Sequence, residues 1–170
     1  MPVNVCTGKR VIILTTMAEI FDIRLLPWEK AQGDAGRIRW QVFVAEQGVP
    51  EDMEWDEWDV QSVHALALTP ASQIIGTARL LPVDGHGGAK LGRMAVLPEW
   101  RGKGAGTALL LALLAEARLH GVREVALRAQ MSAARFYRSH GFIAQGAQFM
   151  EAGILHVGMT LSLGADAWPS

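Results

Sequence analysis

The sequence predicts a mixed α/β fold in which helices cover one central sheet, and three observations lead to this prediction. The chain has 170 residues, half of them apolar, which suits a single domain with one hydrophobic core. Short segments in which apolar and polar residues alternate predict strands, and longer segments with apolar residues at helical spacing predict helices. In the middle of the chain a strand, a helix and a second strand follow one another over residues 90–128, an order typical of helices packed on a sheet.

Residues 1–17 are expected to form a disordered leader. Lys9 and Arg10 precede an apolar run, as in a signal peptide, but the run is short and residues 16–18 make a poor cleavage site. Chain ends without a docking element are usually disordered. We therefore expect a single domain over residues 18–163, followed by a C-terminal tail over residues 164–170.

The first half of the domain is expected to contain strands, one helix and an acidic segment. Alternation over residues 19–26 stops at Pro27 and predicts a strand. Apolar residues recur at helical spacing over residues 32–47, and Gly48 ends the helix that they predict. The acidic segment 51–59 is expected to form a loop or a single turn. Further alternating segments predict strands over residues 63–68, 74–81 and 90–97.

The second half begins with the strongest helical pattern in the chain. A leucine-rich helix is predicted over residues 103–120, ended by Gly121 at its C′ position. A shorter helix is predicted over residues 132–140 and ends at Gly141. Strands are expected around this helix and at the end of the domain, over residues 124–128, 142–150 and 155–163. Together with the strands of the first half they predict a six- or seven-stranded sheet.

The charge and cysteine counts exclude several classes of protein. Sixteen basic residues balance seventeen acidic ones, whereas proteins that bind nucleic acid usually carry a basic excess. The single cysteine, Cys6, excludes an internal disulfide framework and a cysteine-based zinc site, and it favours a reducing compartment. No apolar run approaches the roughly 20 residues that span a bilayer. We expect a cytoplasmic protein that binds neither nucleic acid, membrane nor metal.

A glycine-rich loop precedes the leucine-rich helix. Gly102, Gly104 and Gly106 stand at every second position, which lets the backbone approach a ligand closely. At a helix start, such a loop aims unpaired N–H groups and the positive end of the helix dipole at one point, and Arg101 and Lys103 add charge. The loop therefore predicts a site for a phosphate-bearing ligand.

Three known phosphate loops compete for this segment. A Walker A loop requires Ser or Thr after its lysine, but Gly104 follows Lys103. The Rossmann fingerprint requires glycine at the position of Thr107. The third pattern, Gln/Arg-x-x-Gly-x-Gly/Ala, is met by Arg101, Gly104 and Gly106. In this pattern the segment resembles the pyrophosphate loop of the GNAT family of N-acetyltransferases.

A second motif follows, Gln130-x-x-Ala133-x-x-Phe136-Tyr137-x-x-x-Gly141-Phe142. Taken alone it is an ordinary core stripe on a helix, but its distance from the glycine loop matches the helix and strand that close the coenzyme groove in this family. The similarity extends over residues 19–163 and is to the ElaA-like branch, through Arg39-x-x-Val42-Phe43-Val44-x-Glu46-Gln47-Gly48-Val49-Pro50, Glu54-x-Asp56, His64, residues 76–80, residues 90–94 and His156-x-x-Met159. Two positions depart from the pattern: Ala105 replaces a larger aliphatic residue, and Gln130 stands where many relatives have Asn.

The resemblance implies a GNAT fold, a mostly antiparallel twisted sheet flanked by helices and splayed in the middle to bind acyl-CoA. It implies an enzyme that uses acetyl-CoA to acetylate a primary amine of a small molecule or peptide directly. The cofactor-binding residues that it implies are Met94, Ala95, Val96, Arg101, Gly102, Lys103, Gly104, Ala105, Gly106, Thr107, Gln130, Ala133 and Phe136.

Two residues are the candidate catalytic groups. The resemblance implies that Tyr137, the single tyrosine of the chain, lies near the sulfur and protonates the leaving thiolate. Glu46 is the candidate general base, through a pKa raised by partial burial, although it would equally serve as a partner of Arg39 or Arg93. Two histidines on predicted strands, His64 and His156, are alternative bases.

The acceptor site is open to two opposed interpretations. The acidic residues of segment 51–59, with their two tryptophans, would attract a cationic amine, or they form a solvated loop. Arginines on strands would instead select an acceptor that carries a carboxylate. The candidate substrate-binding residues are Glu54, His64, Arg79, Arg93, Arg128 and His156.

Three functions remain open at this stage. The first is the acetyltransferase, for which no covalent intermediate is needed because Cys6 lies in the expected leader and no Ser-His pair is evident. The second is a non-catalytic acyl-CoA-binding module, against which the presence of Tyr137 argues. The third is a transfer of a longer acyl group or a synthesis of the homoserine-lactone type. A homodimer is also left open.

Overall fold

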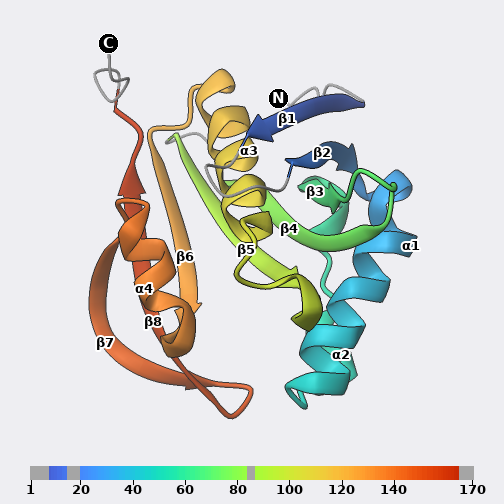
Figure 1. Ribbon diagram of the computed structural model, residues 1–170. Helices are drawn as coiled ribbons and strands as arrows, with labels where there is room; N and C mark the ends of the chain where they lie inside the picture. The colour runs from blue at the N-terminus through green and yellow to red at the C-terminus, as the bar shows by residue number, and fades with distance from the viewer. Residues whose placement is uncertain (1–7, 15–19, 84–86, 165–170) are drawn as a thin grey trace.

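One sheet forms the centre of the computed structural model, which describes residues 8–14, 20–83 and 87–164. Its strands in the described residues are β1 (Lys9–Leu14), β2 (Ile20–Pro27), β3 (Val63–Leu68), β4 (Ile74–Val83), β5 (Gly88–Val96), β6 (Glu124–Gln130), β7 (Ile143–Glu151) and β8 (Ile154–Ser162). They lie in the order β1-β2-β3-β4-β5-β6-β8-β7 (Figure 1). Every neighbouring pair is antiparallel except β5 and β6, which are parallel. The predicted mixed α/β fold with a mostly antiparallel sheet is confirmed.

The helices follow the predicted order, with shifted boundaries. They are α1 (Trp28–Arg39), α2 (Glu51–Glu54), α3 (Ala105–Leu119) and α4 (Ala134–Ser139). A π-helix, η1 (Trp40–Glu46), continues α1, and single 3-10 turns lie at Asp59–Gln61, Pro98–Trp100 and Met131–Ala133. Among the helices of the described residues, none is long and apolar enough to cross a membrane.

The sheet has one strand more than the sequence predicts, because β1 lies within the expected leader. Its residues pair antiparallel with β2, from Lys9 opposite Leu25 to Leu14 opposite Ile20. Three consecutive β-branched residues, 11–13, favour an extended strand, and their pairing covers the edge that β2 would otherwise expose. The expectation of disorder is therefore wrong for residues 9–14. Residues 1–7, with Cys6, and residues 165–170 of the tail lie outside the described part.

The first helix begins earlier than predicted and changes character along its length. It starts at Trp28, directly after Pro27, whose extended backbone (φ −70°, ψ 160°) precedes the first turn. Beyond Arg39 the hydrogen-bonding pattern widens to that of a π-helix, which continues to Glu46. π-Helical segments are rare and occur often at functional sites. Periodicity predicted the helical extent but not this change in its hydrogen bonds.

Helices cover both faces of the sheet, and β3 shows this most clearly because all six of its residues are buried. Leu66 and Leu68 pack with Ala31 and Ala35 of α1. On the other face, the alanines of β3 belong to the larger core with the leucines of α3, which crosses the strands in Figure 1. Burial of both faces explains why this strand carries little polar alternation.

The sheet opens between β5 and β6. The two strands pair only over Gly88–Lys90 and Glu124–Ala126, after which they diverge, as Figure 1 shows. From residue 91 onward, β5 therefore has no strand partner on that edge among the described residues. The splayed sheet that the sequence resemblance implied is present.

A β-bulge lies in β5 where the strands diverge. Between Thr77 and Arg79 of β4 the register shifts, so that Arg93 and Met94 of β5 stand opposite Ala78 alone. Arg93 adopts a positive φ of 53°, in the left-handed region. A bulge bends its strand and increases the local twist, which directs the end of β5 away from β6.

Candidate active site

The amino end of α3 carries free backbone donors. Gly104 precedes the helix in the left-handed conformation (φ 95°), and no side chain caps the end. The first hydrogen bond back to the loop is donated by the N–H of Ala108 to the Gly104 carbonyl. The N–H groups of Ala105, Gly106 and Thr107 therefore have no partner within the helix, and the helix dipole adds positive potential at this point.

The surroundings of this helix end fit a diphosphate. A Cβ added to Gly106 would stand 3.6 Å from Cζ of Phe136, so α3 and the segment around α4 approach closely here. The Lys103 ammonium lies 4.8 Å from the centre of the Trp100 ring, so a positive charge lies beside the loop. Gly102, with φ 74°, lets the loop turn without steric cost. Glycine backbone, free donors and positive charge are the features that an anionic group requires.

Arg101 joins this loop to η1 and β5. Its guanidinium donates two hydrogen bonds of 2.7 Å each to the carboxylate oxygens of Glu46, and its Nε donates to the Val96 carbonyl at 2.9 Å. The hydrogen bonds from Arg101 lower the pKa of the Glu46 carboxyl. The sequence expectation of a raised pKa at Glu46 is therefore wrong, and its role as a general base stays a prediction. Its partner is Arg101, whereas the sequence suggested Arg39 or Arg93.

The end of η1 also contacts β6, the strand on the other side of the opening from β5. The Gln130 side-chain amide, at the end of β6, donates to the Gln47 side-chain carbonyl at 2.7 Å. Residues 46 and 47 thus contact the loop before α3 on one side and β6 on the other. The carbonyl oxygen of Gln130 remains a hydrogen-bond acceptor, which the amide N–H groups of a pantetheine arm require.

Tyr137 lies where β5 and β6 diverge. Its hydroxyl donates to Sδ of Met94 at 3.6 Å, so the phenol of α4 meets the bulged segment of β5. Phe136 and Phe142 hold the ring edge-on, with centroids 5.1 and 5.7 Å away. Burial raises the pKa of Tyr137 to about 12. The phenol is therefore neutral at physiological pH, and its only described partner is a weak thioether acceptor.

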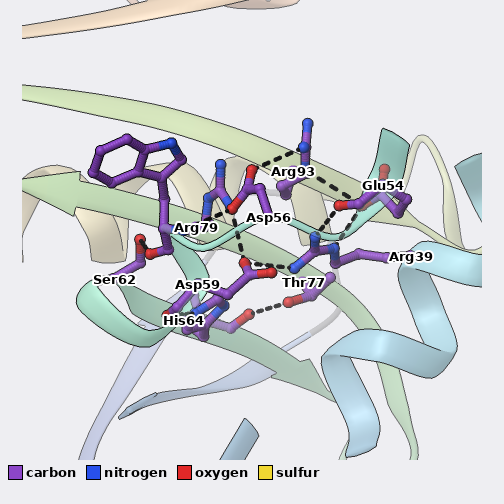
Figure 2. A network of polar contacts seen from close by, with 11 residues as sticks. Arg39, Glu54, Asp56, Asp59, Ser62, His64, Thr77, Arg79 and Arg93 are labelled. Carbon is purple, nitrogen blue, oxygen red and sulfur yellow. Dashed lines mark hydrogen bonds and ion pairs between the residues drawn. The ribbon is translucent and has the colours of Figure 1, made fainter. Parts of the chain in front are cut away.

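A network of six charged side chains lies on the α1 face of the sheet (Figure 2). Arg39 is at its centre and is 1% exposed. It donates to Glu54 Oε1 at 2.6 Å and to Asp59 Oδ1 at 2.8 Å. The guanidinium lies 5.5 Å from the ring centre of Trp28 and 4.9 Å from that of Trp55. Such a buried, paired arginine fixes the acidic segment to the end of α1.

The two strand arginines complete this network. Arg79 donates to Asp56 at 2.6 Å and to Asp59 at 2.8 Å. Arg93 Nη2 donates to Asp56 at 3.0 Å, and its Nε lies 3.4 Å from Glu54. Three arginines therefore neutralise three carboxylates. Both sequence interpretations of the acceptor site counted residues of this network, and within it their charges balance. Three further acidic residues of segment 51–59 are exposed and lie outside the network, namely Glu51, Asp52 and Glu57.

The pKa values follow from burial and pairing. Burial raises the pKa of Glu54 more than the neighbouring Arg93 and Arg39 lower it. Burial also raises the pKa of Asp59, but the hydrogen bonds and charges of Arg39 and Arg79 outweigh it, and the net pKa is lowered.

His64 lies beside this network and is 1% exposed. Its Nε2 is 2.9 Å from the Asp59 carbonyl oxygen, and its ring lies 4.8 Å from that of Trp28. Burial lowers the pKa of His64, which keeps the imidazole neutral. The expected roles of His64 as a substrate ligand and an alternative base stay predictions, and its burial against Trp28 gives the ring no access to solvent.

The remaining two candidates lie apart, on β6 and β8. Arg128 is exposed, donates to Glu151 at 2.7 Å and lies over the Phe149 ring at 5.8 Å. His156 stacks on Phe149, and its Nδ1 is 2.7 Å from the Ile154 carbonyl oxygen. The six substrate candidates therefore form two groups. Glu54, His64, Arg79 and Arg93 lie in or beside the charge network, and Arg128 and His156 lie on strands beyond the opening between β5 and β6.

The candidate site residues did not include three members of the charge network and one of the η1 contacts, namely Arg39, Asp56, Asp59 and Gln47. Arg39 and Gln47 belong to the quoted ElaA-like pattern, but nothing in their spacing indicates a partner. One signal was available for Arg39: it is a charged residue next to Ile38 and three residues before Val42, and both of these apolar residues are buried. A charge beside a core stripe indicates a buried ion pair.

Comparison with known proteins agrees with this geometry. A family model of the acetyltransferase (GNAT) domain matches residues 29–163. The uncharacterized N-acetyltransferase YjcF of Bacillus subtilis is 36% identical over 132 residues, which cover 77% of this chain and 92% of YjcF.

Solved structures share the fold. An acyl-CoA N-acyltransferase from Pseudomonas aeruginosa superposes with a TM-score of 0.71 at 31% identity, and Escherichia coli ElaA with 0.73 at 27% identity. Each comparison covers 82% of this chain and 98% of the other. The chain therefore belongs to the GNAT family of acetyltransferases, enzymes that transfer an acyl group from acyl-CoA.

Proposed function

We propose that the protein is an acetyl-CoA-dependent N-acetyltransferase that acts directly on a primary amine of a small molecule or peptide. The observation that carries the proposal is the buried phenol of Tyr137, which meets the free edge of β5 at Met94. A non-catalytic acyl-CoA-binding module has no need of a protonated, partly unsatisfied phenol at that point. The position of Tyr137 therefore favours catalysis over binding alone.

Three parts of the chain would hold acyl-CoA. The free N–H groups at the start of α3 would bind the diphosphate, with charge supplied by Lys103. The free edge of β5 over residues 94–96 would bind the pantetheine arm through its backbone, as a strand partner would. Gln130 would accept a hydrogen bond from an amide of the same arm.

The chain's own groups divide the chemistry between them. Acyl-CoA supplies a thioester, whose carbonyl carbon an amine attacks and whose sulfur leaves. A backbone N–H on the free edge of β5, within residues 94–96, would donate to the carbonyl oxygen as negative charge develops on it. Tyr137 holds a proton at its hydroxyl, and with a pKa of about 12 it retains that proton at neutral pH until a basic sulfur receives it.

Thiol release from acetyl-CoA in the presence of a panel of amines tests the proposal. We expect turnover that saturates in acetyl-CoA and depends on the amine. Saturable binding of acetyl-CoA without thiol release from any amine would instead support the binding module. Faster turnover with a longer acyl-CoA than with acetyl-CoA would show that the longer acyl-CoA is the preferred donor.

A single glycine substitution tests the diphosphate site. Gly104→Ala places a Cβ on a residue with φ 95°, which shifts the backbone and misaligns the donors at the start of α3. Hydrogen bonds to charged groups are worth about 1.5–3 kcal/mol each, so we expect Kd for acetyl-CoA to rise roughly 10- to 100-fold. Isothermal titration calorimetry measures this change.

Gly121→Ala is the matched control, because Gly121 also has a positive φ, of 72°, but follows the other end of α3. It carries a similar conformational cost and should leave Kd for acetyl-CoA unchanged. Equal affinities of the two variants would contradict the assignment of the loop.

A further inference from the structure

The bulge in β5 is built on a residue that does not favour its conformation. Arg93 has φ 53°, and in this region the Cβ of any residue other than glycine is crowded by backbone. Glycines stand at many positions of positive φ in this chain, including Gly102 and Gly104 in the loop. Among the described residues, three residues other than glycine share this conformation, namely Ser72, Arg93 and Ala152, and of these Arg93 alone has a charged side chain.

Two acidic residues hold the guanidinium of Arg93. Nη2 donates to Asp56 Oδ2 at 3.0 Å, and Nε lies 3.4 Å from Glu54 Oε1. Nε is buried and makes no hydrogen bond to the part of the chain that the structure describes, so the nearby Glu54 charge is what compensates its burial. The side chain thus spans from β5 to the acidic segment, as Figure 2 shows.

Both acidic residues are themselves fixed by other arginines. Glu54 accepts from Arg39 at 2.6 Å, and this anchors it to the end of α1. Asp56 accepts from Arg79 at 2.6 Å, and this anchors it to β4, next to the bulge. The Arg93 guanidinium therefore has two supports, one through Arg39 and one through Arg79, and these two arginines are joined because both donate to Asp59.

We propose that Arg93 is a positioning residue: its ion pairs hold the left-handed bulge of β5 and so direct the backbone of residues 94–96. The inference rests on the proposed function, because residues 94–96 are the strand edge assigned there to acyl-CoA. If the bulge relaxes, these N–H groups turn from the direction of the thioester carbonyl, and Met94 moves relative to Tyr137. A misplacement of about 1 Å in such a site costs on the order of 100-fold in rate.

Two variants separate this role from direct contact with the acceptor. Arg93→Ala and Arg93→Gly both remove the guanidinium, but glycine adopts a positive φ without steric cost. A positioning role predicts that Arg93→Ala lowers kcat about 100-fold. It also predicts that kcat of Arg93→Gly is at least about five times that of Arg93→Ala. Direct contact with the amine predicts equal losses, with an increased KM for the amine in both variants.

The decisive measurement is the kcat ratio of Arg93→Gly to Arg93→Ala, with KM for the amine and for acetyl-CoA measured alongside. A ratio of about five or more, with little change in either KM, supports the proposal. Equal kcat values, whether both are low or both equal that of the wild type, overturn it. If Arg93→Ala does not fold, then near-wild-type kcat in Arg93→Gly supports the proposal and a 100-fold loss overturns it.

Ser72 supplies a matched control, because it also has a positive φ, of 64°, in the turn between β3 and β4. Ser72→Gly and Ser72→Ala change the same backbone preference away from β5 and should leave kcat unchanged. Wild-type protein that shows no thiol release refutes the proposed function. Active wild type with equal Gly and Ala variants at position 93 refutes only the role of Arg93.

Discussion

Replacing Tyr137 by phenylalanine is expected to lower kcat by about 10²–10⁴ and to leave Kd for acetyl-CoA nearly unchanged. Among the described residues the hydroxyl donates to Met94 Sδ alone, at 3.6 Å, so its loss breaks no strong hydrogen bond seen there. The ring keeps its edge-on contacts with Phe136 and Phe142. Steady-state kinetics of thiol release, with calorimetric titration of acetyl-CoA, measures both quantities. An unchanged kcat would show that Tyr137 carries no proton in the reaction.

The same residue predicts how stability changes at alkaline pH. Its pKa is about 12 in the folded protein and near 10 when exposed, so the folded state binds the phenolic proton more tightly. The resulting stability is fully present below pH 10 and is lost as the pH rises from about 10 to about 12. We expect this alkaline decrease in the free energy of unfolding to be smaller in Tyr137→Phe than in the wild type.

Replacing Arg39 by alanine is expected to cost about 3–5 kcal/mol of the free energy of unfolding. The substitution leaves the Glu54 and Asp59 carboxylates buried without the guanidinium that bonds both. It also empties the space between Trp28 and Trp55, which flank the guanidinium. Urea unfolding followed by circular dichroism measures the loss.

Arg37→Ala is the control for this substitution. Arg37 lies two residues earlier on α1, is exposed, and donates only to the Ile74 carbonyl, at 3.3 Å. Its removal should change the free energy of unfolding by about 0.5 kcal/mol or less. Similar losses in both variants would mean that the buried network contributes nothing beyond an ordinary surface arginine.

The strands and helices that the sequence predicted best are those with a strong local period. Buried alanines and leucines recur at helical spacing from Ala105 to Ala117 of α3, and Gly121 follows the end of that helix, so its position was clear. The strand β1 was missed because its strand character depends on pairing with β2. Its apolar run, residues 11–14, is too short to show a period that separates a strand from part of a leader.

The candidate site divides in the same way. The glycine loop and the motif around Tyr137 are short patterns, each contained within about a dozen residues, and both were found from the sequence. The partner of Glu46 is 55 residues away, and that of Gln47 is 83 residues away. Nothing in the local sequence distinguishes a glutamate that will meet an arginine from one that will meet solvent.

By itself, the sequence determined the order of the elements, the loop at the start of α3 and the identity of the single phenol, because these depend on spacing along the chain. Only the tertiary structure decided that Glu54, Asp56 and Asp59 of the acidic segment pair with Arg39, Arg79 and Arg93. It also decided that the pKa of Glu46 is lowered and that Arg93 holds a left-handed bulge. Charge and backbone conformation at these points depend on neighbours that folding brings within about 3 Å, and the ion pairs concerned cross between separate elements of the fold.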